Sequence, residues 1–485
     1  MNLGRGVIAV ARLAGAALAG LPVTAWAHTF GERYDLPVPL GYFVVGAAAA
    51  VALSFIVAAL FMRGAARKLH QERFVVPLGP IWPALRIACQ LVSVIALCTL
   101  VTAGLFGTHN PQLNLAPVLV WIIWWVGLPL LVACIGNIWP ALDPWRALFE
   151  WGNAAVRRLG NANGICLGLP YPARLGAWPA VFLLLLFVWI EVIYPQAVDP
   201  RHLATMALAW SAVTLLGMVC FGGNAWRRNA DVFSLYFSTL GRFAAIATGR
   251  DARSIVLRPP GLGLIESPAE SLAIVAFVIA MLATVLFDGL LGTQALAFVH
   301  RALTASLPGV VDERGYVLGT VGLICVWLLF LGAYFVSCMV TARLVRERPI
   351  SAIARMFALT LVPIAIAYNL AHYFSYLLAQ GQLIIPLLSD PLGLKWNLFG
   401  TATYSPDIGL LDARITWYLA ISSIVTGHVI SIWLAHRLAL REFRTPRQAV
   451  IASVPLTVLM MAYTTISLLV MAEPLVQFTL PAGPS

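Results

Sequence analysis

The chain has 485 residues, of which 61% are apolar and only 11% are charged, and its mean hydropathy is +0.88. So few charges cannot cover a water-soluble surface, which excludes that class of protein. The seven cysteines form no CxxC pair, which excludes a secreted disulfide scaffold. Apolar runs of about 18 residues or more recur, each long enough to cross a hydrocarbon core of about 30 Å. The sequence therefore predicts an all-α, polytopic transmembrane helix bundle.

The first residues are typical of a signal peptide. Arg5 and Arg12 flank the start of a short apolar stretch, and an Ala-Trp-Ala cleavage pattern follows at 25–27. We predict cleavage after Ala27, which leaves His28 at the mature N-terminus and 28–485 as a single multi-pass membrane domain. The alternative is that this segment stays attached as an uncleaved first span.

Ten further spans are predicted, at about 40–62, 83–106, 116–138, 177–194, 203–222, 269–290, 316–341, 356–380, 415–436 and 449–472. An even number places both mature ends on one side of the membrane. Of the 31 Lys and Arg residues, two then lie in the signal peptide, six on the side of His28 and 23 on the other side. The positive-inside rule predicts that the mature N- and C-termini lie outside the cytoplasm, which for a bacterial inner membrane is the periplasm. Most of the +11 net charge would face lipid headgroups, so the expected partner is the bilayer and not nucleic acid.

Two predicted cytoplasmic connections resemble interfacial helices, near 144–159 and 232–247. In the first, Asp143 is a suitable N-cap and Pro144 suits the first helical turn. Apolar residues then recur at helical spacing while arginines take the other face, which is typical of a helix lying on a membrane surface. The longest predicted outer loop, near 381–414, is expected to lie over the outer end of the bundle.

Ionisable side chains inside predicted spans are the strongest candidates for a functional site, because burying them in lipid is costly. Glu191, Asp288, His372 and His428 come from four different spans and lie in the predicted outer half or close to the midplane. The Tyr-Asn pair at 368–369 lies about one turn before His372 and can orient its ring. The alternatives are that each histidine only hydrogen-bonds a neighbouring helix and that each carboxylate reaches out to interfacial water.

Two carboxylates and two imidazoles are ligands suited to a divalent metal ion such as Zn, Mn, Fe or Cu, which could activate a bound water. We predict Asp288, His372 and His428 as metal ligands, with His28 adding its ring and free amine. Glu191 and Asp288 are the predicted catalytic residues, Glu191 as a base or fourth ligand. No H-E-x-x-H or H-x-H motif occurs, so these side chains must converge through helix packing.

Short segments along the whole mature chain resemble the bacterial membrane proteins called fenitrothion hydrolases. They are AHTFGERYDLPVPL (27–40), GNIWPALDPWRALFEWG (136–152), FVWIEVIYPQAVDPR (187–201), LFDGLLGT (286–293), YNLAHYFSYLLAQGQ (368–382) and TGHVISIWLAH (426–436). The resemblance implies an organophosphorus hydrolase that cleaves the aryl ester of fenitrothion to 3-methyl-4-nitrophenol and dimethyl thiophosphate. The resemblance does not indicate which residues are catalytic, so the predicted site is inferred only from the residue types and their positions in the spans.

Two other functions remain open from the sequence. The same histidines and carboxylates could pass an ion through a non-enzymatic permease or a copper- or zinc-handling protein. Against a secondary transporter, the sequence has no inverted repeat and no paired broken helices. The chain could also be one subunit of a hydrolase that a second membrane subunit completes. In a hydrolase, a lipophilic organophosphorus substrate would reach the site from the bilayer.

Overall fold

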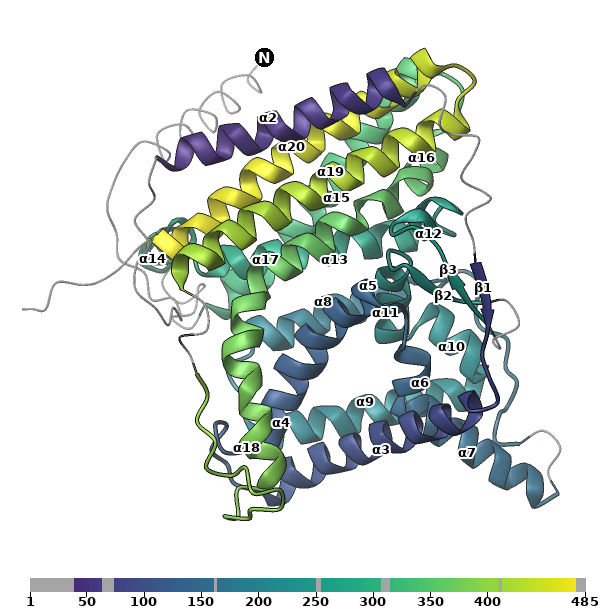
Figure 1. The fold of residues 1–485 in the computed structure, drawn as a ribbon, viewed down its shortest axis with the longest axis vertical. Coiled ribbons are helices and arrows are strands. Elements are labelled where there is room, and N and C mark those ends of the chain that lie inside the picture. The colour runs from purple at the N-terminus through teal and green to yellow at the C-terminus, as the bar shows by residue number, and fades with distance from the viewer. Residues whose placement is uncertain are drawn as a thin grey trace, which may run out of the picture.

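The computed structural model describes residues 39–62, 74–160, 164–249, 254–306, 315–407, 409 and 412–476. The predicted signal peptide at 1–27 and its His28 lie outside these ranges. Within them the chain folds into a bundle of apolar helices with three short strands (Figure 1). The prediction of an all-α membrane helix bundle is confirmed in this coarse form.

Nine helical segments in the described part of the chain are long and apolar enough to cross a membrane. They are α2 (Leu40–Phe61), α3 (Trp82–Phe106), the run of α4 (Leu115–Pro117), η3 (Val118–Gly127) and α5 (Leu128–Cys134), α9 (Pro200–Phe221), α13 (Leu272–Leu291), α15 (Tyr316–Val345), the run of α16 (Ile350–Phe357), η4 (Ala358–Leu361), α17 (Val362–Gln380), η5 (Gly381–Leu383) and α18 (Ile384–Ser389), α19 (Ala413–Glu442) and α20 (Pro446–Val476). The other helices are α6 (Trp139–Leu142), α7 (Pro144–Arg158), α8 (Trp178–Val192), α10 (Gly223–Asn229), α11 (Val232–Gly241), α12 (Leu262–Ile265) and α14 (Gln294–Ser306).

The one predicted span that is not among these nine segments, at 177–194, corresponds to α8. This helix has only 15 residues. At 1.5 Å per residue it covers about 22 Å, which is less than a hydrocarbon core of about 30 Å. The number of spans, and the periplasmic termini inferred from it, therefore stay predictions.

The helices form two groups, joined by the segments between them (Figure 1). In one group α2 packs against α19 and α20, and α15 packs against α13 and α20. In the other group α3 packs against α9 and α7. The groups are connected through η3, which contacts α17, and through α8, which contacts α13. We call the end at which α3, α8 and α13 finish, on the left of Figure 1, the site end.

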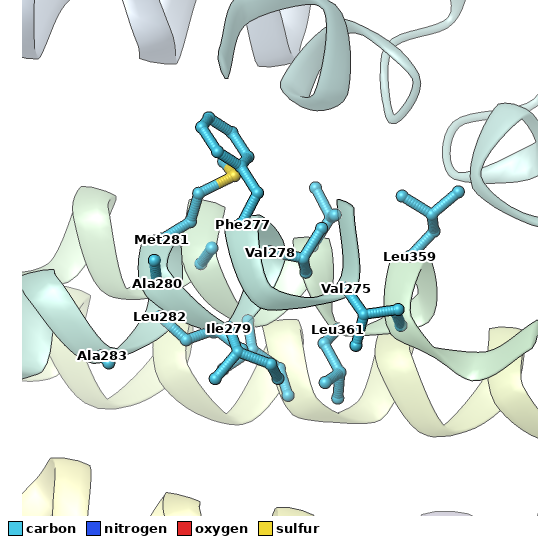
Figure 2. Close-up of a cluster of buried hydrophobic side chains, with 14 of the residues drawn as sticks. Val275, Phe277, Val278, Ile279, Ala280, Met281, Leu282, Ala283, Leu359 and Leu361 are labelled. Carbon is cyan, nitrogen blue, oxygen red and sulfur yellow. The ribbon is translucent and has the colours of Figure 1, made fainter. Parts of the chain in front are cut away.

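Helix α13 is the core of the larger group, and Figure 2 shows part of its packing. Fifteen of its 20 residues are buried. A helix that is apolar on every side is stable only when protein or lipid surrounds it, and here neighbouring helices do so. Because lipid tails are as apolar as these side chains, close packing rather than transfer from water holds the helix in place.

Two glycines show how closely the spans approach one another. A Cβ on Gly104 of α3 would overlap the Pro200 carbonyl oxygen and the Ala204 side chain of α9. A Cβ on Gly427 of α19 would overlap Ala367 and lie 2.8 Å from the Pro363 carbonyl oxygen of α17. Small residues at such crossings let helix backbones pack tightly in a membrane.

A three-stranded antiparallel sheet lies at the end opposite the site end (Figure 1). Strand β1 (Phe74–Pro77) pairs with β3 (Ser254–Leu257), which also pairs with β2 (Ile246–Thr248). Phe74 and Ile246 both face Leu257 in the register. The sheet thereby joins the connection between α2 and α3 to the segment that follows α11.

The two predicted interfacial helices differ in the structure. The segment at 144–159 forms α7, whose N-cap Asp143 accepts a hydrogen bond of 3.0 Å from the backbone N–H of Arg146. The segment at 232–247 forms α11, which ends at Gly241 and has nine of its ten residues buried. Its apolar residues surround the helix and pack inside the protein, and its position at a membrane surface stays a prediction.

Candidate functional site

Asp288 lies near the end of α13 and contacts two consecutive residues of α17. His372 Nε2 is 3.0 Å from Asp288 Oδ2, and Tyr373 Oη donates a hydrogen bond of 2.6 Å to the same oxygen. The side chains of Asp288 and His372 are 24% and 20% exposed, so the pair is partly buried. These contacts fix both the carboxylate and the imidazole ring, as in an Asp–His pair that handles protons.

Glu191 of α8 lies beside this pair. A small cavity is lined by Glu191, Asp288 and Tyr373, with Tyr236, Asn369 and Trp125 among the other lining residues. Its volume is about 10 Å³, which is room for about one water molecule. The Trp125 indole is a hydrogen-bond partner of the Glu191 side chain. The arrangement therefore places two carboxyl groups around a space of the size of one water.

Three aromatic residues line the cavity: Trp125 on η3, Tyr236 on α11 and Tyr373 on α17. The Trp125 and Tyr236 rings have centroids 5.1 Å apart, and the amide of Asn369 donates a hydrogen bond of 3.4 Å to Tyr236 Oη. The predicted role of the Tyr-Asn pair in orienting His372 is met in part: the Tyr368 ring stacks at 6.2 Å from the His372 ring, whereas Asn369 faces Tyr236. A helix with π-type hydrogen bonding, such as η3, frequently occurs at functional sites.

His428 does not join the other predicted residues. It is 1% exposed, its Nδ1 is 2.8 Å from the Ile424 carbonyl oxygen of its own helix, and its Nε2 has no hydrogen-bond partner. The reason is geometric: the neighbouring Gly427 contacts α17 at Ala367. From Ala367 to His372, α17 turns by about 140° and rises by about 7.5 Å. His428, next to Gly427, therefore faces different surroundings from His372.

The described residues bring together part of the predicted metal site. Within the described ranges, no three His, Cys, Asp or Glu side chains lie close enough to hold a metal ion. Asp288 and His372 meet and Glu191 lies near them, but His428 is elsewhere and His28 lies outside the described residues. A metal ion at this site therefore stays a prediction.

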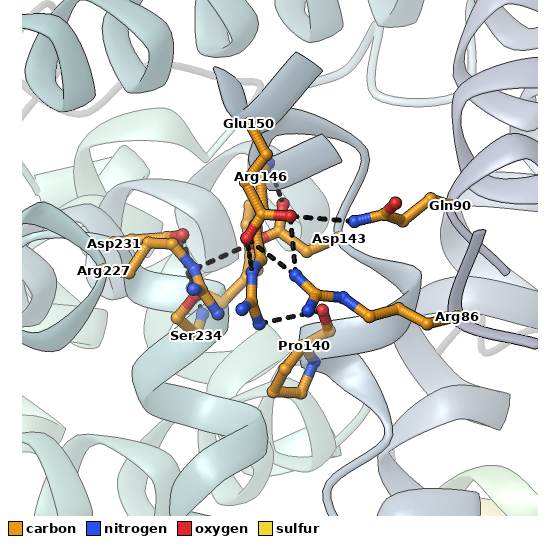
Figure 3. Close-up of polar contacts among 10 residues, drawn as sticks. Arg86, Gln90, Pro140, Asp143, Arg146, Glu150, Arg227, Asp231 and Ser234 are labelled. Carbon is orange, nitrogen blue, oxygen red and sulfur yellow. Dashed lines mark hydrogen bonds and ion pairs between the residues drawn. The ribbon is translucent and has the colours of Figure 1, made fainter. Parts of the chain in front are cut away.

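A second group of charges lies near the starts of α7 and α11, where the sequence analysis named only Asp143, as a helix cap (Figure 3). Arg227 Nε is 3.0 Å from Asp143 Oδ2, and the Ser234 hydroxyl donates a hydrogen bond of 2.9 Å to Asp231 Oδ2. Burial raises the pKa of Asp143, although Arg227 opposes it. Burial and repulsion from Asp143 raise the pKa of Asp231 to about 7. Asp231 can therefore change its charge near neutral pH.

Glu150 connects the same region to α3. It accepts hydrogen bonds of 2.7 Å from Arg146 Nε and 2.7 Å from Arg86 Nη2, and one of 3.0 Å from the amide of Gln90. Burial acts to raise the pKa of Glu150, but the two arginines and Gln90 outweigh it and lower that pKa. Because the partners lie on α3 and α7, this network holds α7 against the bundle.

Sequence reasoning missed Tyr373, Tyr236 and Trp125. Tyr373 directly follows His372, so adjacency to a buried histidine was the available signal. Tyr236 and Trp125 lie in apolar, aromatic segments that carry no comparable signal.

The comparisons with known proteins add no name to this site. No family model matches the chain, and neither a curated protein nor a solved structure gives a significant match.

Proposed function

We propose that this chain is a membrane-bound hydrolase of lipophilic organophosphorus triesters, with fenitrothion as the representative substrate. The single observation that carries the chemistry is the cavity lined by Glu191 and Asp288. His372 and Tyr373 hold the Asp288 carboxylate in place. The substrate class comes from the resemblance of the sequence segments to fenitrothion hydrolases. A neutral, lipophilic triester concentrates in the bilayer, where a site between helices can receive it.

The proposed reaction uses the water-sized space between the two carboxyl groups. Glu191 takes a proton from the water, and the water oxygen forms a bond to phosphorus. The bond from phosphorus to the aryl oxygen breaks, and 3-methyl-4-nitrophenolate leaves with the electron pair. Dimethyl thiophosphate is the other product. Asp288 orients His372, and Tyr373 Oη holds the carboxylate in place while charge develops on the phosphoryl group.

The location follows the arginine distribution of the sequence. We propose a bacterial inner membrane with the site end toward the periplasm, because most arginines fall in connections at the opposite end.

The test is release of the yellow nitrophenolate by purified protein in lipid nanodiscs. We expect Glu191→Gln and Asp288→Asn each to lower kcat/KM by about 100-fold or more, since a positioned base contributes about 10² to 10⁴. Asp199→Asn is the matched control, because this carboxylate lies at the same end of the bundle as an N-cap and not at the cavity. Unchanged turnover in both site variants would refute the proposal.

A chelator distinguishes a mechanism in which Glu191 alone is the base from one that uses a metal ion. The base mechanism predicts unchanged turnover with a chelator, whereas loss of turnover would indicate a metal ion at the site. Turnover that occurs in native membranes and is absent from pure protein would favour a second membrane subunit.

A second candidate is favoured by the size of the cavity. A space of about 10 Å³ takes a water and has no room for an aryl triester without side-chain movement. Ionisable Asp and His side chains inside membrane spans are typical of proton relays in membrane transport proteins. A pH-sensitive dye inside proteoliposomes measures this activity: proton uptake that Asp288→Asn abolishes, with no nitrophenolate release, would select transport over hydrolysis.

A further inference from the structure

The connection after α18 exposes a group of large apolar side chains. We call residues 394–399 the apolar loop; its exposed large apolar members are Leu394 (51%), Trp396 (42%), Leu398 (60%) and Phe399 (70%). So many exposed apolar groups on a short segment mark a contact with lipid or with another protein.

The backbone of the apolar loop is held by its own polar groups. The two carboxylate oxygens of Asp390 accept hydrogen bonds of 2.8 Å from the N–H of Leu394 and 2.7 Å from the N–H of Lys395. Ser389 Oγ accepts a hydrogen bond of 3.1 Å from the N–H of Phe399, and its carbonyl oxygen accepts one of 3.0 Å from the N–H of Leu398. Lys395 adopts a φ of +66°, which is uncommon for a residue with a side chain. The polar groups therefore point inward, and the fixed backbone leaves the apolar side chains outside.

The loop is attached to the end of a membrane span. The N–H of Thr108 donates a hydrogen bond of 2.8 Å to the Leu392 carbonyl oxygen, and the N–H of Leu115 donates one of 3.3 Å to that of Pro391. Thr108 follows the end of α3 at Phe106, which is 73% exposed. Figure 1 shows α18 reaching the end of α3 at the edge of the molecule.

The depth of this position follows from the length of α3. Its 25 residues cover about 37 Å, so the helix extends beyond a hydrocarbon core of about 30 Å. If the excess length is shared between the two ends, a loop bonded to one end lies at the level of the headgroups. The exposed apolar side of α3, which includes Val92 (62%) and Ile95 (61%), continues through Phe106 toward the loop.

The chemistry of the patch fits lipid better than protein. Tryptophan and other aromatic residues concentrate where hydrocarbon meets headgroups. Lys395 is exposed among the apolar side chains and can reach lipid phosphates. We propose that the apolar loop inserts into the boundary between headgroups and acyl chains of the leaflet at the site end, and so anchors the outer part of the α17–α18 segment to the membrane.

Collision measurements on spin labels test this directly. A label at Leu398→Cys is compared with one at Ser405→Cys, an exposed polar position of the same connection, in a chain without other cysteines and in phospholipid nanodiscs. We expect oxygen to relax the label at 398 more strongly than a water-soluble nickel complex does, with the reverse order at 405. Nickel access at 398 equal to that at 405 would overturn the proposal.

A label at 398 shielded from both reagents would overturn it as well, because a protein surface, from a second copy or a partner, would then cover the loop. The unmodified chain gives an independent measurement if the cysteine-free background does not fold. Hydroxyl-radical footprinting in nanodiscs should modify Trp396 and Phe399 several-fold less than Tyr404, after correction for intrinsic reactivity. Tyr404 is 40% exposed, close to the 42% of Trp396. Equal modification contradicts lipid insertion.

Discussion

The buried Asp231 offers the most quantitative prediction. Its pKa rises from 3.8 to about 7 in the folded protein, chiefly because burial disfavours the charge and also because Asp143 repels it. At a pH well below 3.8 the carboxyl is protonated in both the folded and the unfolded chain, so it does not affect stability. As the pH rises toward 7 the unfolded chain loses this proton first, and the free energy of unfolding falls. Above pH 7 the loss is complete.

The size of the effect follows from the shift in pKa. One pKa unit corresponds to about 1.4 kcal/mol, so the full loss is about 4 kcal/mol, of which about 3 kcal/mol falls between pH 4.5 and 7.5. Asp231→Asn removes the titration while an asparagine can still cap α11. We therefore expect the variant to gain stability over the natural protein as the pH rises across this range. With an entropy of unfolding of roughly 2 cal/mol/K per residue, the gain in Tm is about 3 °C for this chain.

The assay is Tm from intrinsic tryptophan fluorescence at several pH values between 4.5 and 7.5. Asp199→Asn is the control, because it also replaces an aspartate N-cap by asparagine. The pKa of Asp199 is lowered by the backbone N–H of His202, so its replacement should cost stability at neutral pH. A difference in Tm between Asp231→Asn and the natural protein that stays constant with pH would refute the reasoning.

Three further predictions concern packing, the site and a helix cap. Gly427→Ala should destabilise the protein by about 1–3 kcal/mol because its Cβ meets the α17 backbone, whereas Gly332→Ala on α15, with nothing within 4 Å, should not lower Tm. Tyr373→Phe removes the 2.6 Å hydrogen bond to Asp288 and should lower the kcat/KM of nitrophenolate release about 10- to 100-fold; an unchanged value would exclude this contact from catalysis. Asp412→Ala removes the acceptor for the N–H of Ile415 at the start of α19 and should cost about 1 kcal/mol, measured by Tm, while Asp412→Asn should retain most of it.

The sequence predicted the class of fold because hydropathy and length determine which segments can cross a membrane. It also identified Asp288 and His372 as candidates, since buried ionisable groups are costly anywhere in a span. It did not predict that Tyr373 hydrogen-bonds Asp288 or that His428 lies away from Asp288 and His372. The rotation of each helix about its axis determines which side chains meet. The apolar residues of α13 and α19 are spread around the helix, so the sequence gives little information on that rotation.

The burial of α11 follows from its composition. Val232, Phe233, Leu235 and Tyr236 place apolar groups on several sides of one helix. A helix with that distribution is buried, and the short length of α11 placed it inside the protein between longer spans. Asp231 is consequently buried with it, which is the origin of its raised pKa.

The packing of α2 against α19 and α20 has a consequence for biogenesis. About 350 residues separate the end of α2 from the start of α19, and synthesis at roughly 5–20 residues per second takes tens of seconds or more to bridge them. During that interval α2 sits in the bilayer without its final neighbours and depends on lipid or on the insertion machinery for contacts. A ribosome that stops before α19 would release a chain whose early helix exposes its unfilled face, a signal that membrane proteases can recognise.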